Sequence, residues 1–141
     1  MKFAVILAHP RAASLNAQIA HTVVERLVVM GHDVVLRDLY SIGFDPRLMA
    51  DELPHPAMAP PPPDVAAERR RLADRDGFVF VYPFWFNTPP AILKGYIERV
   101  LSMGFGYEPI VGGGTQPLLG GKSLTSFSTS GAPDRWVETS G

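Results

Sequence analysis

Aromatic side chains and an amide are concentrated in one short segment, residues 83–87, directly after the apolar run 78–82. The run is typical of a strand that is buried on both faces of a parallel sheet. The segment therefore follows the carboxyl end of a strand, which is the edge where open α/β sheets bind ligands. Exposed aromatic rings on a proline-stiffened turn suit the wall of a site for a flat, conjugated molecule.

A second candidate segment is the loop at residues 9–16, which contains His9, Arg11, Ser14 and Asn16. Ser14 is placed to cap a helix that begins at about Leu15. The start of a helix presents unpaired N–H groups and the positive end of the helix dipole, so it binds phosphate readily. Most serine caps are only structural, and this signal gains its weight from the aromatic segment that accompanies it.

The order of the elements explains how these segments would meet. We expect strands at residues 3–8, 33–38, 76–82 and 122–128, helices at 15–30, 65–75 and 90–103, and a glycine-rich loop at 104–121. This alternation predicts an α/β fold with an open parallel sheet, in the flavodoxin-like order 2-1-3-4, and helices on both faces. Strands one, three and four would then be neighbours, and the loops after them would converge.

Two segments fit this scheme less directly. Residues 40–64 are proline-rich without a clear period, and we expect either a tolerated surface insertion or a flap beside the site. The basic run at 69–71 is typical of a solvated helix face.

Composition narrows the function further. The chain has 141 residues, a net charge of −1 and no cysteine, which favours one domain and disfavours nucleic-acid binding, disulfides and thiol catalysis. His21, His32 and His55 lack partners at metal-ligand spacing, so we expect no metal site. The chain begins with neither a membrane span nor a secretory segment, and we expect a cytoplasmic protein without membrane insertion.

The run PFWFNTPPAILKGYIERV at residues 83–100, followed by Gly-Phe-Gly-Tyr at 104–107, resembles the NAD(P)H:quinone oxidoreductases of flavodoxin-like fold, the DT-diaphorase type. The resemblance extends over nearly the whole chain. It implies a bound FAD or FMN, NAD(P)H as electron donor, and two-electron ping-pong transfer through flavin N5 to a quinone or another planar acceptor. It also implies a homodimer, because the family builds its acceptor pocket across two subunits.

The resemblance assigns residues to each part of the site. The cofactor-binding residues that it implies are His9, Ser14, Leu15 and Asn16 near the phosphate, Pro83, Phe84, Trp85, Phe86 and Asn87 along the ring, and Thr129, Ser130, Gly131, Ala132 and Trp136 after the fourth strand. It places Phe105 and Tyr107 at the acceptor, with Tyr107 as the catalytic candidate.

The sequence departs from the family in ways that leave alternatives open. Ala132 replaces a glycine, and no match to a family histidine that assists charge on the reduced cofactor occurs before Gly141. The family's fifth strand is also absent, so we expect residues 1–141 to form one flavin-binding domain that is incomplete at its C-terminus relative to the family. One alternative function is a flavin-binding regulatory subunit of a membrane potassium-efflux system. A flavodoxin-like electron carrier is a weaker alternative, which residues 104–107 disfavour.

Overall fold

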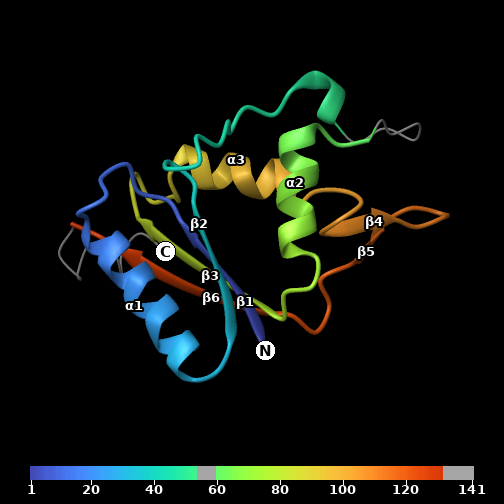
Figure 1. Cartoon of the computed structure of the whole chain (residues 1–141). Coiled ribbons are helices and arrows are strands. Elements are labelled where there is room, and N and C mark those ends of the chain that lie inside the picture. The colour runs from blue at the N-terminus through green and yellow to red at the C-terminus, as the bar shows by residue number, and fades with distance from the viewer. Residues whose placement is uncertain (54–59, 132–141) are drawn as a thin grey trace.

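Four parallel strands form the central sheet in the order β2-β1-β3-β6 (Figure 1). The computed structural model describes residues 1–53 and 60–131. The strands are β1 (Lys2–Leu7), β2 (Asp33–Asp38), β3 (Gly77–Pro83) and β6 (Ser123–Thr129). The predicted flavodoxin-like order is confirmed, with β6 as the fourth strand. Within the described part of the chain nothing pairs with the outer side of β6, whose Leu124 and Phe127 are exposed.

Helices cover both faces of this sheet, as predicted (Figure 1). They are α1 (Leu15–Val29) on one face, and α2 (Pro63–Leu72) and α3 (Ala91–Val100) on the other. Successive residues of a strand point to opposite faces. In β1, Val5 and Leu7 therefore pack with Ala17 of α1, whereas Ala4 and Ile6 pack under the other two helices.

The prediction of a plain loop at residues 104–121 is wrong. A two-stranded antiparallel hairpin lies there, made of β4 (Tyr107–Pro109) and β5 (Thr115–Pro117). Gly112, Gly113 and Gly114 have positive φ angles and form its turn. Strands of three residues that each end in proline leave too little alternation for the sequence to reveal them.

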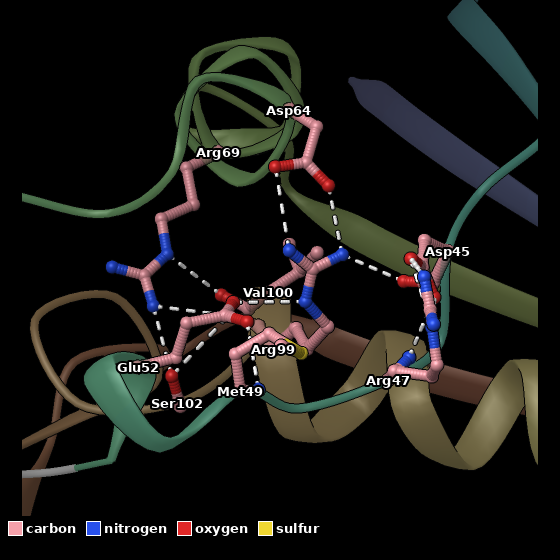
Figure 2. Close-up of polar contacts among 9 residues, drawn as sticks. All are labelled: Asp45, Arg47, Met49, Glu52, Asp64, Arg69, Arg99, Val100 and Ser102. Carbon is pink, nitrogen blue, oxygen red and sulfur yellow. Dashed lines mark hydrogen bonds and ion pairs between the residues drawn. The ribbon is translucent and has the colours of Figure 1, made fainter.

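The described part of the long segment at residues 40–62 is tied to α3. It contains a short 3-10 helix, η1 (Ala50–Glu52), and its Pro46 packs against Gly95. Arg99 of α3 donates to the Asp45 carbonyl at 2.6 Å, to Glu52 at 2.8 Å and to Asp64 of α2 at 2.7 Å (Figure 2). Arg99 and Glu52 are both almost completely buried. Residues 54–59, which include Pro54, His55 and Pro56, lie outside the described residues.

The basic run on α2 is not simply a solvated face, which corrects the prediction. Arg69 is half-buried and donates to the carbonyls of Arg99 and Val100 and to the Ser102 hydroxyl (Figure 2). It thus caps the C-terminus of α3, where carbonyl groups lack helical partners. Burial lowers the pKa of Arg69. Arg70 and Arg71 are exposed, and Arg71 pairs with Glu68.

Candidate functional site

The loops that follow β1, β3 and β6 meet at one edge of the sheet, on the left in Figure 1. The rings of His9 and Trp85 are 5.8 Å apart, centroid to centroid. The Phe84 N–H donates to the Thr129 carbonyl at 2.7 Å, and the Asn16 amide donates to the Thr129 hydroxyl at 2.9 Å. The structure therefore brings together residues of all three predicted segments.

The first loop is held in shape by its own polar groups. Nδ1 of His9 accepts the Arg11 N–H at 3.0 Å, so in this arrangement the other ring nitrogen carries any proton available to a ligand. Ser14 is the N-cap of α1, and its hydroxyl accepts the Ala17 N–H at 3.1 Å. Leu15 is 60% exposed beside this cap. The first turn of α1 contains no acidic residue, which leaves its positive end uncompensated for an anion.

The aromatic segment forms a tight turn, in which Trp85 and Thr88 exchange two main-chain hydrogen bonds of 3.0 Å. The two central residues, Phe86 and Asn87, have φ angles of 49° and 59°. Two positive φ angles are the signature of a type I′ turn, which normally carries Asn or Gly. Asparagine tolerates this conformation, but a phenylalanine there is strained. Its side chain is also completely exposed, so no packing in this chain compensates for the strain.

The remaining predicted residues, in the aromatic segment and after β6, differ in their exposure. Pro83 ends β3 and is buried, whereas Trp85 is 43% exposed. Ser130 and Gly131 are exposed after β6, and a side chain at Gly131 would meet nothing within 4 Å. The predicted contacts at Ala132 and Trp136 lie outside the described residues.

Phe105 and Tyr107 do not reach this edge of the sheet within one chain. Tyr107 begins the β4–β5 hairpin, which projects from the opposite side of the molecule (Figure 1). Phe105 packs at the α2–α3 side, where the Arg69 guanidinium lies 6.0 Å from its ring centroid. A groove of about 420 Å³ opens there, and Pro61, Ala66, Arg69, Arg70, Ala73, Gly104 and Phe105 line it.

The sequence interpretation missed two buried charged networks, neither of which touches the candidate site. One is the Arg99 cluster of Figure 2. In the other, Glu68 binds Arg37 through two hydrogen bonds and accepts the Tyr96 hydroxyl at 3.0 Å. Burial and the Glu68 carboxylate raise the pKa of Tyr96 well above its usual range. The partners named here lie 28 to 54 residues apart, so no local pattern could have indicated them.

Residues 1–53 and 60–131 contain no group of three or more His, Cys, Asp or Glu side chains that could hold a metal ion. In the same residues, every helix is too short or too polar to cross a bilayer.

Comparison with known proteins agrees with this fold. The family model described as flavodoxin-like fold matches residues 1–141. An uncharacterized NAD(P)H oxidoreductase of Haemophilus influenzae is 36% identical over 133 residues, which cover 94% of this chain and 65% of that protein. The mouse ribosyldihydronicotinamide dehydrogenase [quinone] is 30% identical over 97% of this chain and 67% of its own length. The chain thus spans about two thirds of these relatives.

A solved structure extends the likeness to three dimensions. The NAD(P)H:quinone oxidoreductase from Methanothermobacter marburgensis superimposes with a TM-score of 0.85 at 28% identity, over 100% of this chain and 72% of that one. The chain therefore belongs to the flavodoxin-like fold family, and within it to the NAD(P)H:quinone oxidoreductases.

Proposed function

We propose that the protein is a cytoplasmic, flavin-dependent NAD(P)H oxidoreductase that reduces a quinone or a similar planar acceptor. The convergence of three loops at the sheet edge, one of them a strained aromatic turn, is the observation that carries this proposal. The absence of cysteine from the chain is compatible with a reducing compartment. The names of the relatives, which are NAD(P)H and quinone oxidoreductases, support the reaction class.

The donor set of the first loop fits the phosphate of FMN or FAD. The first N–H groups of α1, at Leu15 and Asn16, have no acceptor within the helix. The exposed Arg11 adds a positive charge, and the free nitrogen of His9 adds a donor. In this proposal the phosphate lies at the start of α1, where the helix dipole and these donors favour an anion.

The aromatic turn and the third loop fit the flavin ring. Trp85, whose ring lies near that of His9, and Phe86 are exposed and offer flat apolar surface to a conjugated ring, with Asn87 as a polar contact at the turn. The open space at Gly131 allows a ligand to approach the main chain of residues 129–131. N–H groups of this loop would stabilise negative charge on the ring after reduction. The flavin itself, when bound, accepts a hydride from NAD(P)H and passes two electrons to the acceptor.

The acceptor pocket requires a second copy of the chain in this proposal. Phe105 and Tyr107 lie on the opposite side of the molecule from the three loops, so one chain cannot bring them to its own cofactor (Figure 1). The hairpin that begins at Tyr107 exposes Ile110 and Val111, the second completely, as an apolar tip suited to a partner. A homodimer would place Tyr107 of each subunit over the cofactor of the other.

Flavin titration and turnover of the full-length protein test the proposal. We expect FMN or FAD to bind with fluorescence quenching, and the loaded protein to oxidise NADH or NADPH only when a small water-soluble quinone is supplied. Absence of any flavin binding would overturn the proposal. Flavin binding without turnover, together with stable association with a potassium-efflux transporter, would instead indicate a regulatory subunit.

A further inference from the structure

A reciprocal hydrogen bond joins the phosphate end of the candidate site to its ring end. The Asn16 amide nitrogen donates to the Thr129 hydroxyl at 2.9 Å, and that hydroxyl donates back to the Asn16 amide oxygen at 3.3 Å. Asn16 is only 3% exposed, although it lies in the first turn of α1. Both polar atoms of its side chain are thus engaged, and burial leaves the side chain little surface to offer a ligand.

Thr129 carries this connection onward to the aromatic turn. Its hydroxyl holds Asn16, while its main-chain carbonyl accepts the Phe84 N–H at 2.7 Å. Thr129 is the last residue of β6, where the paired strands end and the loop begins. One residue therefore fixes the position of the third loop relative to both of the others.

We propose that Asn16 and Thr129 are a pair of positioning residues, and that Asn16 acts through Thr129 on the flavin ring and not as a ligand of the phosphate. The inference rests on the proposed flavin site. Breaking the bond removes one restraint on the backbone at residues 129–131, whose N–H groups would stabilise negative charge on the ring in that proposal. The consequence is a change in ring binding and redox potential that does not depend on the phosphate.

FMN and riboflavin, which lacks the phosphate, separate the two roles of Asn16. In the full-length protein, Asn16→Ala and Thr129→Val should each weaken the binding of both flavins by the same factor, roughly two- to tenfold. The double variant should lose no more than either single variant, because both break one bond. Thr129→Ser keeps the hydroxyl and should behave as the parent does. Ser14→Ala is the contrasting control, and should weaken FMN more than riboflavin.

The midpoint potential of bound FMN gives a second readout. Asn16→Ala and Thr129→Val should shift it in the same direction, whereas Thr129→Ser should leave it unchanged. The inference is overturned if Asn16→Ala weakens FMN alone, if the two losses add, or if the potential stays at the parental value. Thermal melting of each flavin-free variant checks that it is folded.

Amide hydrogen exchange tests the pair without any cofactor. In the flavin-free protein, Thr129→Val should accelerate exchange of the Phe84 N–H, and Thr129→Ser should not. A protein that binds no flavin but shows this acceleration would refute the proposed function and leave the structural coupling intact. Unchanged exchange in the valine variant would refute the coupling itself.

Discussion

The backbone of Pro46 lies directly against Gly95 of α3, and a Cβ atom at Gly95 would lie 2.7 Å from the Pro46 Cα. Gly95 lies inside α3, four residues before Arg99. The close approach explains why a buried helical position holds a glycine, although glycine is unfavourable in helices. It also fixes the long segment at residues 40–53 against the helix.

Gly95→Ala should therefore destabilise the protein, although alanine is the better helix former. We expect the free energy of unfolding to fall by about 1–3 kcal/mol, because the methyl group forces Pro46 to move. Urea denaturation measures the change. Lys94→Ala is the matched control: its side chain is exposed and pairs only with Glu98, and it should change stability by less than about 0.5 kcal/mol. Equal stability of the Gly95→Ala variant and the parent would show that Pro46 moves aside at no measurable cost in free energy.

Replacing Arg99 by methionine should be far more costly. The change leaves the buried Glu52 carboxylate without its cation, and removing one partner of a buried pair costs about 3–5 kcal/mol. Chemical denaturation should detect the loss. The double variant Arg99→Met with Glu52→Gln should recover part of it, because no buried carboxylate is then left unpaired and the other partner of Arg99, Asp64, is half-exposed. A single variant that unfolds at the parental midpoint would contradict this reading of the cluster.

The buried Tyr96 predicts a loss of stability in alkali. Its pKa is raised by burial and by Glu68, so its neutral form is favoured in the folded state. A tyrosine in the unfolded chain has a pKa of about 10. The contribution of Tyr96 is therefore complete below that pH and is lost as the pH rises further, by up to about 1.4 kcal/mol per pH unit. Denaturation midpoints between pH 9 and 12 should fall more steeply for the parent than for Tyr96→Phe.

The strained turn predicts a conflict between stability and function. Phe86→Gly should stabilise the flavin-free protein by about 0.5–1 kcal/mol, since relief of about 1–2 kcal/mol at a positive φ exceeds the added chain entropy. The same variant should bind flavin or acceptor more weakly, because the exposed ring is lost. Asn87→Gly is the control, since asparagine already tolerates this conformation. A lower melting temperature for Phe86→Gly would refute the assignment of strain.

Tyr107 should affect the acceptor half of the reaction alone. Removal of its hydroxyl in Tyr107→Phe should slow reoxidation of the reduced protein by quinone roughly two- to tenfold, if the hydroxyl donates to a quinone oxygen. Reduction by NAD(P)H should be unchanged. Rapid mixing separates the two half-reactions. Mixing this variant with one that cannot bind flavin tests whether the residue acts from the partner subunit, because only heterodimers would then combine an intact Tyr107 with a bound cofactor.

The sequence alone predicted the sheet, its order and the location of the candidate site. Uninterrupted apolar runs predicted β1 and β3, helical spacing predicted α1, and the alternation of strands and helices predicted the flavodoxin-like order that the sheet has as β2-β1-β3-β6. They succeeded because buried parallel strands and amphipathic helices each carry their own local pattern. The same patterns predicted that residues 9–16, 83–87 and those after the fourth strand share one edge of the sheet.

The tertiary structure alone decided which residues within those segments touch. The Asn16–Thr129 bond spans 113 positions, and the Arg99–Glu52 pair spans 47. Neither pair can be predicted from local composition, because a polar residue at a loop or helix end gives no indication of which distant residue it contacts. The sequence also did not show that Tyr107 lies on the opposite side of its own chain from the three loops. A motif gives the type of a residue, and only the path of the chain gives its position.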